Sequence, residues 1–203
     1  MVNIENKKPG APFYSAWVLF SIVSGVTAFV AYLLIMRIYN AFAGDWIVIN
    51  GKTHIAEDFL LPYILWPIFG LLYGYLQYIL LRRYFPHMGW WILATAISLS
   101  FTFLGLDMGW SIASALGIDP YSVWLVVIQL MLVGGFLGAA QWFVLRRQIP
   151  NAVWWIPANM VGWGMVGFTG ALGVFTILVY PAIITGVALY LLLRQSYFQQ
   201  NAV

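Results

Sequence analysis

The stretch GLLYGYLQYILLRRYFPHMGWWILA, residues 70–94, decides the fold, because it returns at residues 134–158 as GGFLGAAQWFVLRRQIPNAVWWIPA. The spacing is 64 residues throughout, without an insertion, and 11 of the 25 positions are identical. Both copies contain a GxxxG pattern, a Gln, Leu-Arg-Arg, a Pro and Trp-Trp-Ile. We interpret each copy as a helix that ends at Arg-Arg, a short turn, and a second helix that begins at Trp-Trp.

The composition points to a membrane protein. Of the 203 residues, 63% are hydrophobic and 7% are charged, whereas a soluble domain carries about 25% charged residues. The formal charge of +3 is better explained by loop residues that set orientation than by a nucleic-acid surface. The chain has no Cys, which excludes disulfides, Cys-based metal sites and thiol catalysis. We expect a multi-pass protein of the cell (inner or plasma) membrane, with membrane lipids as partners.

Apolar runs of about 20 residues predict transmembrane helices. We expect an all-α bundle of six, forming a single transmembrane domain over residues 1–203. The helices are predicted at residues 16–36, 59–81, 90–106 and 123–145, and two share residues 153–193 with a split near 170–173. Along the chain, residues 1–58 hold the N-terminal segment, first helix and outer loop, 59–122 and 123–173 are the two repeats, and 174–203 are the last helix and a tail. The run at 16–36 is too long for a signal peptide, so we expect it to be retained.

Basic residues set the orientation of a multi-pass protein, because they are enriched in cytoplasmic loops. Six spans with both termini in the cytoplasm place seven of the nine Lys and Arg residues on the cytoplasmic side. Amphipathic indole rings prefer the membrane interface. The predicted cytoplasmic interface anchors are Arg82, Arg83, Arg146, Arg147, Trp90, Trp91, Trp154 and Trp155.

The two copies have the same orientation, which predicts a pseudo-rotation axis along the membrane normal. A third copy, divided between the chain ends, is an open possibility. Residues 186–194 align with residues 138–146 at an offset of 48, and Trp17 takes the place of Trp91. Such a third unit requires contact between the first and last helices.

The GxxxG glycines, Gly70, Gly74, Gly134 and Gly138, are predicted to let helices approach closely. Gln77 and Gln141 follow on the same helix face and need partners, since an unpaired amide in hydrocarbon costs several kcal/mol. Thr95 and Asn159 are candidate partners. The alternative is that Gln77, Gln129, Gln141 and Asn159 line a binding or transport path.

Outside the repeats, Asp107 is a candidate binding residue near the outer interface. Residues 39–58 are expected to form a solvated outer loop without a metal site, although His54 and Glu57 lie three residues apart. The core of residues 108–122, WSIASALGI, is expected to form a short interfacial helix. Pro67 and Pro181 should kink their helices.

The pattern GxxQWxxLRRxxPxxxWW, best kept over residues 138–155, resembles a group of uncharacterised bacterial multi-pass membrane proteins with repeated Gln-Trp and Leu-Arg-Arg blocks. The resemblance covers about residues 70–194, and Tyr78 replaces the first Trp in the first copy. It implies a membrane location but no activity, and it carries over no binding or catalytic residue.

The sequence does not specify a biochemical activity. No protease, metallohydrolase or phosphate-loop motif is present, so we expect a protein that is not an enzyme. The first hypothesis is an accessory, scaffold or assembly subunit that contacts other membrane protein subunits. The alternative is a protein that binds or transports a small solute, lipid or pigment. In size and topology the chain also resembles the substrate-binding subunits of energy-coupling-factor vitamin transporters. A lipid, quinone or pigment is the kind of ligand that its aromatic residues, 18% of the chain, would contact.

Overall fold

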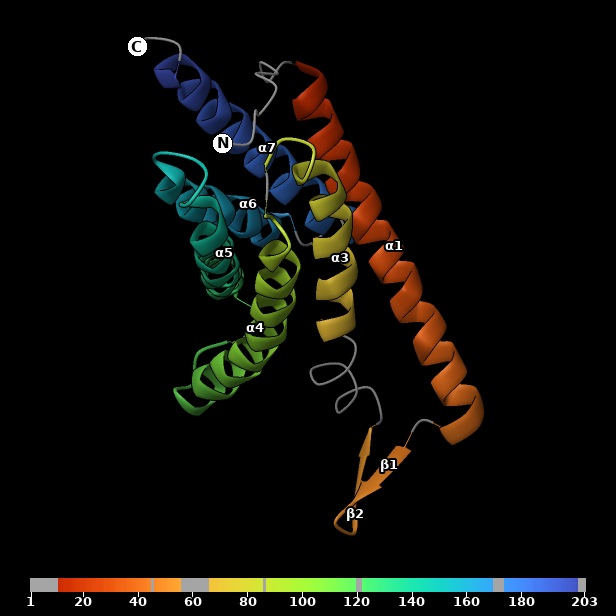
Figure 1. The fold of residues 1–203 in the computed structure, drawn as a ribbon. Coiled ribbons are helices and arrows are strands. Elements are labelled where there is room, and N and C mark those ends of the chain that lie inside the picture. Colours follow the sequence, from red (N-terminus) through yellow and green to blue (C-terminus); the bar gives the residue numbers. More distant parts are fainter. Residues whose placement is uncertain are drawn as a thin grey trace.

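The computed structural model describes residues 11–44, 46–55, 66–85, 87–119, 122–169 and 174–200. These residues are mostly helical (Figure 1). The α-helices are α1 (Ala11–Ala43), α3 (Trp66–Leu81), α4 (Trp90–Ala115), α5 (Val123–Leu145), α6 (Trp155–Phe168) and α7 (Val174–Gln200), and a short 3₁₀ helix, η2 (Ala152–Trp154), precedes α6. Within the described residues, these six α-helices lie at the six places where the sequence predicts helices.

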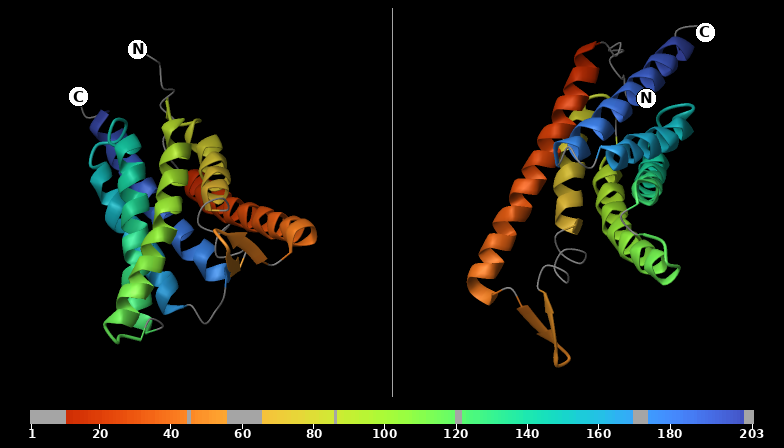
Figure 2. Two further views of the ribbon diagram at one scale, coloured as in Figure 1. Left: turned by 90° about the horizontal axis from the view of Figure 1, so that it is seen from below. Right: turned by 180° about the vertical axis from the view of Figure 1, so that it is seen from behind.

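The six α-helices form a closed ring. Each one packs against the helix before it and the helix after it, and α7 packs back against α1. The start of α1 and the end of α7 lie toward the same end of the molecule, at the top of Figure 1. The second half of α1 extends away from α5 and α6, which both views in Figure 2 show.

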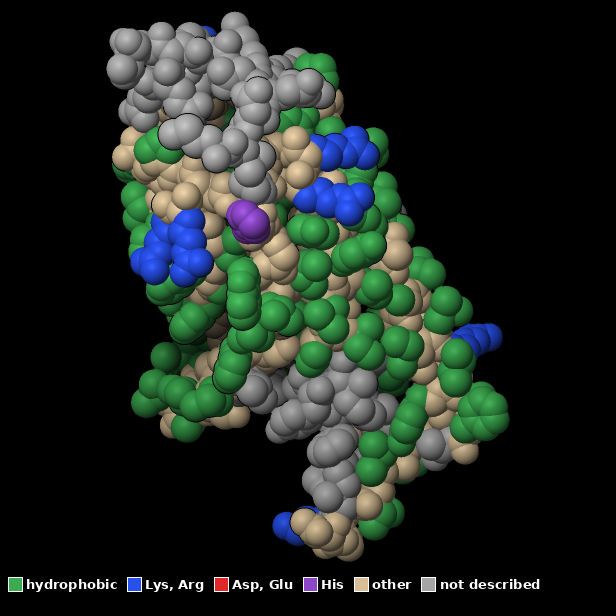
Figure 3. Space-filling view, in the orientation of Figure 1, with side chains coloured by type: hydrophobic (Ala, Val, Ile, Leu, Met, Phe, Trp, Pro, Cys, Tyr) green, Lys and Arg blue, Asp and Glu red, His purple; other side chains and the backbone are tan. Residues whose placement is uncertain are grey.

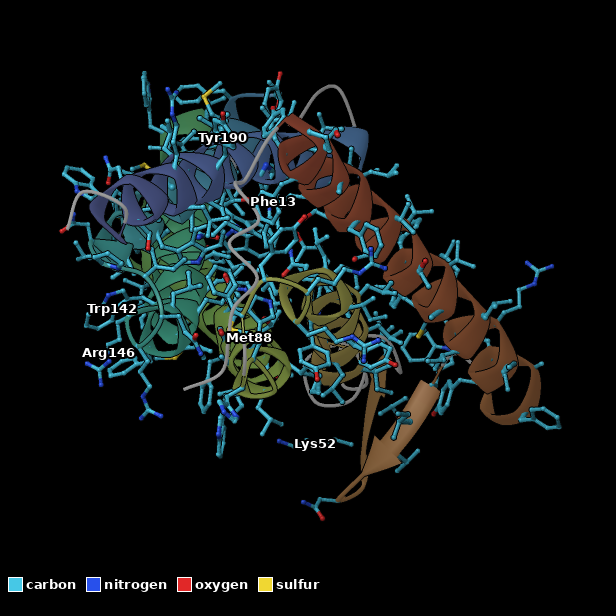
Figure 4. The ribbon with its side chains drawn as sticks, turned by 45° about the horizontal axis from the view of Figure 1, so that its top comes forward. Phe13, Lys52, Met88, Trp142, Arg146 and Tyr190 are labelled. Carbon is cyan, nitrogen blue, oxygen red and sulfur yellow. The ribbon has the colours of Figure 1, made fainter. Side chains whose placement is uncertain are left out.

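The hydrophobic core lies at the end of the bundle that carries the Arg-Arg turns. Leu81, Leu145 and Leu193 are buried there, and each directly precedes an arginine. Figure 4 looks toward this end, where Phe13 and Met88 point inward between the helices. The other buried members are Trp17, Leu80, Phe85, Trp91, Ile149, Ala152, Trp155, Leu189 and Leu192.

Among the residues that the structure describes, three helices are long and apolar enough to cross a membrane: Pro12–Phe42, Val123–Leu145 and Leu178–Ser196. Two shorter apolar helices, Trp66–Leu81 and Trp90–Thr102, accompany them. The second half of α1 exposes large apolar side chains, with Leu34 at 58% and Phe42 at 89% of full exposure. Such a surface fits contact with lipid or with another protein, and the chain is a helical protein with three candidate membrane spans.

Two helices are longer than predicted. The first was expected at residues 16–36 and extends over Ala11–Ala43. The third was expected to end at residue 106, but α4 continues to Ala115. The prediction of a separate interfacial helix in residues 108–122 is therefore wrong for the part before Leu116. Asp107 and Gly109 do not interrupt the helix, which ends at Ala115 with Leu116 as its C-cap, directly before Gly117, whose φ is +68°.

The outer segment 39–58 is not simply a loop. It contains an antiparallel hairpin of β1 (Trp46–Ile49) and β2 (Lys52–Ile55), in which Trp46 pairs with Ile55 and Ile49 with Lys52. The turn is Asn50-Gly51, with φ of 51° and 75°. Positive φ at both positions is the signature of the tight turn that Asn-Gly favours. Asp45, Glu57, Asp58 and the side chain of His54 lie outside the described residues.

The two prolines differ from each other. Pro67 is the second described residue of α3, and the residues before Trp66 lie outside the described set, so its predicted kink stays a prediction. Pro181 is inside α7, as predicted. Gly162 of α6 faces it, since a Cβ on Gly162 would lie 3.1 Å from the Pro181 Cα atom. The expected split at 170–173 lies outside the described residues.

Candidate functional site

Three tryptophans meet in the middle of the ring. The ring centroids of Trp17 and Trp91 are 6.2 Å apart, and Trp155 lies 5.8 Å from each of them. Their exposure is 0%, 0% and 1%. Trp91 and Trp155 lie in the first turns of α4 and α6, and Trp17 is the seventh residue of α1. One indole from each of three helices therefore fills the centre of the ring. We call these residues the tryptophan cluster.

Each repeat ties its tryptophan to a glutamine of the preceding helix. Trp91 Nε1 donates to Gln77 Oε1 at 3.1 Å, and Trp155 Nε1 donates to Gln141 Oε1 at 3.0 Å. Both bonds join residues 14 apart in sequence. The repeated residues therefore make the same contact, although the sequence did not point to tryptophan as the partner.

The glutamine amide nitrogens reach the neighbouring unit. Gln141 Nε2 donates to Thr95 Oγ1 at 3.0 Å, and Gln77 Nε2 donates to Ser21 Oγ at 3.3 Å. The predicted pairing of a buried glutamine with Thr95 is confirmed. Gln77 and Gln141 are 3% and 2% exposed, so their amides are satisfied by protein groups, as burial in an apolar bundle requires.

The α7 and α1 pair has a related but shifted arrangement. Leu189 takes the place that Gln141 has in the second repeat, and Trp17 Nε1 donates instead to Thr185 Oγ1, at 3.2 Å. Thr185 is one helical turn before Leu189. Gly186 lies against this contact, because a Cβ there would be 2.9 Å from Trp17 Cδ1. The contact between the first and last helices, which a third unit requires, is present.

The four predicted packing glycines lie at two equivalent helix contacts. A Cβ on Gly70 would lie 2.6 Å from the Cα atom of Ala96, and one on Gly74 would lie 3.1 Å from that of Ile92. On Gly134 the added atom would be 2.4 Å from a carbonyl oxygen of α6, and on Gly138 it would be 3.0 Å from the Cα atom of Ile156. Backbones this close leave no room for a side chain, as expected for small-residue faces.

Asn159 does not pair with a glutamine among the bonds seen in the described residues. It is 2% exposed, and its Nδ2 donates to the backbone oxygen of Trp155 at 2.9 Å. It borders a small cavity of about 10 Å³ next to Gln77, Gln141 and Thr185, which has room for about one water molecule. The Tyr73 side chain also borders this cavity.

Asp107 lies in α4, and its side chain is outside the described set, so its predicted binding role stays a prediction. One turn further along, Trp110 Nε1 donates to Gln129 Oε1 of α5 at 3.0 Å. In the part of the chain that the structure describes, no group of three His, Cys, Asp or Glu residues could hold a metal ion.

The interface anchors divide into two groups. Trp90 and Trp154 are each 66% exposed, and Arg82, Arg83, Arg146 and Arg147 are exposed at the turns. Trp91 and Trp155 are buried, so their prediction as interface anchors is wrong, because each indole N–H is bound to a glutamine inside the bundle. Arg146 lies on the outer side of α5 (Figure 4), with its guanidinium carbon 5.0 Å from the Trp142 ring and 4.4 Å from that of Phe143.

The tryptophan cluster and Thr185 are the parts of the site that sequence reasoning missed. A signal for the cluster is present, since Ser21, Thr95 and Asn159 each follow one of its tryptophans by four residues and therefore share its helix face. The buried groups are indoles, amides and hydroxyls. They can donate and accept hydrogen bonds, but they supply no group that titrates near neutral pH.

No protein-family model, curated protein or solved structure matches this chain. The interpretation of the site therefore depends on its geometry.

Proposed function

We propose that this protein is a six-helix, multi-pass protein of the cell membrane, built from three two-helix units around a pseudo-rotation axis along the membrane normal. The units are α3 with α4, α5 with α6, and α7 with α1. The equivalent Gln–Trp bonds and glycine contacts of the first two units support the proposal, as does the meeting of Trp17, Trp91 and Trp155 in one cluster.

Both termini are cytoplasmic in this proposal. The exposed arginines of the two Arg-Arg turns lie at the end where α1 begins and α7 approaches its last turns, which agrees with the enrichment of basic residues in cytoplasmic loops. α3 and α6 have 16 and 14 residues, or about 24 and 21 Å of helix. A helix shorter than a hydrocarbon core of about 30 Å is accommodated by thinning of the bilayer, by snorkelling of flanking residues or by oligomerisation.

Single-cysteine variants test this topology directly, because the chain has no Cys. A maleimide that does not cross membranes should label Lys52→Cys and Leu116→Cys on intact cells. It should label Pro150→Cys and Gln195→Cys only after permeabilisation. All four positions are exposed. Labelling of Leu116→Cys only from the inside would show that α4 does not cross and would contradict the six-span arrangement.

Within this architecture we propose that the protein works through contacts with other membrane proteins, as an accessory or scaffold subunit. The observation that carries the proposal is the filled centre: Gln77 and Gln141 are satisfied by protein groups, and the cavity beside them measures about 10 Å³. Sites for small molecules occupy about 300–1,000 Å³. A solute carrier, the alternative that the sequence leaves open, needs more space at this centre than the described residues provide.

The second half of α1 is the surface that best fits a partner helix. It leaves the ring (Figure 2) and exposes Leu34 and Ile38, each at 58%. Apolar helix faces that do not pack within their own protein are where another subunit can bind.

Purification in a mild detergent followed by native mass spectrometry tests the scaffold role. We expect a hetero-complex of fixed stoichiometry that is lost in the double variant Leu34→Ala, Ile38→Ala. The control is Ile128→Ala, Leu132→Ala on α5, where both residues are 54% exposed. A monomer that carries a specific small solute would contradict the scaffold role. Equal loss in both double variants would contradict α1 as the interface.

A further inference from the structure

A groove opens between α4 and α5 beside the Arg-Arg turn of the second repeat. Its volume is about 530 Å³, which is within the range of about 300–1,000 Å³ that small-molecule sites occupy. The apolar part is formed by Leu93, Ile97, Ala140 and Phe143, and the polar end by His87 and Arg147. The groove is thus apolar along the helices and basic at the end where the helices meet the turns.

The repeat explains why the groove is at this place. Gly70 and Gly74 hold α3 against α4, and Gly134 and Gly138 hold α5 against α6, but α4 and α5 belong to different units. In the first copy, Leu76 occupies the position that Ala140 has in the second copy. The groove at this junction is therefore lined by Ala140, whose side chain has three carbons fewer than that of Leu76.

The charge of the groove selects an anion. The single acidic side chain in the described part of the chain is that of Asp119, and it lies beyond the opposite end of α4 from Arg147. Arg146 lies over the rings of Trp142 and Phe143, which leaves Arg147 as the arginine that lines the groove. Figure 3 shows Lys and Arg side chains and a histidine in the upper part of the molecule, above a broad hydrophobic surface.

We propose that this groove binds one anionic phospholipid from the surrounding bilayer. An acyl chain lies on Leu93, Ile97 and Phe143, and the phosphate of the headgroup lies at Arg147 and His87. Guanidinium groups make charge-assisted hydrogen bonds to phosphate, and basic pockets between transmembrane helices on the cytoplasmic side bind such headgroups. The exposed indole of Trp90, which also lines the groove, suits the same interfacial depth. The proposal depends on the membrane location and is independent of the scaffold role.

The test uses full-length protein in detergent, with native mass spectrometry after addition of phosphatidylglycerol or phosphatidylcholine that carry the same acyl chains. We expect one tightly held phosphatidylglycerol, and a clear preference for it over phosphatidylcholine. Arg147→Gln should lower this preference about fivefold, the factor that one basic residue contributes near an anionic lipid surface. The matched control is Arg83→Gln, which removes the equivalent charge from the other turn and should leave the preference unchanged.

Ala140→Leu gives a second test, because it places in the groove the residue that the first copy already has. It should reduce the retention of both lipids without lowering the unfolding midpoint of the lipid-free protein. Equal binding of the two lipids by the unaltered protein, or equal effects of Arg147→Gln and Arg83→Gln, would overturn the proposal. If Ala140→Leu leaves lipid retention unchanged but releases a protein subunit or a second copy of the chain, the groove belongs to that partner and not to a lipid.

Discussion

Replacement of Gln141 by leucine tests whether the buried polar network stabilises the ring. Gln141→Leu keeps the side chain near its original size and removes two hydrogen bonds between helices, to Trp155 and Thr95, each 3.0 Å long. Such bonds contribute on average about 0.6 kcal/mol each in membrane proteins. The indole N–H of Trp155 is then buried without its partner, at a cost of about 1–3 kcal/mol. We expect the variant to be about 2–4 kcal/mol less stable.

The pairwise part of this energy can be isolated with a double-mutant cycle of Gln141→Leu and Trp155→Phe. The double variant leaves no unpaired amide or indole at this contact, so its loss should be about 1 kcal/mol smaller than the sum of the single losses. Reversible unfolding in mixed micelles, titrated with a denaturing detergent and followed by circular dichroism, measures all three variants. Gln195→Leu, at an exposed position, is the control and should change stability by less than about 0.5 kcal/mol.

The result that refutes this reasoning is additivity. If the two single losses add to within about 0.3 kcal/mol, the Trp155–Gln141 hydrogen bond does not stabilise the ring. Gln77→Leu extends the test, because Gln77 makes the equivalent bond at 3.1 Å. A loss that is much smaller than that of Gln141→Leu would show that the two repeats are not energetically equivalent.

Three further comparisons use the same unfolding assay. Gly134→Ala should cost about 1–3 kcal/mol from overpacking, because its Cβ would lie 2.4 Å from a backbone oxygen. The control Gly135→Ala meets only a flexible side chain at 3.4 Å and should be nearly neutral. Equal losses of stability would contradict the assigned helix contact. Trp91→Phe should lower stability by about 2 kcal/mol through the lost hydrogen bond and contacts. The control Trp90→Phe, at a residue 66% exposed, should have little effect. A larger loss of stability in Trp90→Phe than in Trp91→Phe would contradict the buried cluster. Gly186→Ala should cost about 1–2 kcal/mol, because its Cβ would lie 2.9 Å from an indole carbon of α1, and no loss would show that α7 does not close on α1.

The repeat made the helix contacts predictable from sequence. When the same residues recur at the same spacing on two similar helix pairs, they are expected to make the same contacts. Gly70 with Gly74, and Gly134 with Gly138, indeed lie at equivalent helix contacts. The same argument led to Thr95 as a partner for a buried glutamine. Buried amides have few ways to be satisfied in an apolar bundle, and this limits the choice.

The position of each tryptophan was harder to predict. Trp90 and Trp91 are neighbours in sequence but about 100° apart around the helix, so one is exposed and the other is buried. Interface preference alone assigns both to the membrane surface, as it did for Trp154 and Trp155. The hairpin was missed although Asn50-Gly51 is a strong short-range signal for it. We had expected a solvated loop between the first two predicted helices.

The closure of the ring by Trp17 and Thr185 has a consequence for biosynthesis. These residues are 168 positions apart, so α1 is synthesised well before α7, and this side of the ring can form only after α7 has been made. Until α7 has been synthesised, the indole N–H of Trp17 lacks its partner, Thr185. A contact between such distant segments forms late. The side of α1 that faces α7 therefore stays uncovered until α7 has been made, and α7 then closes the ring.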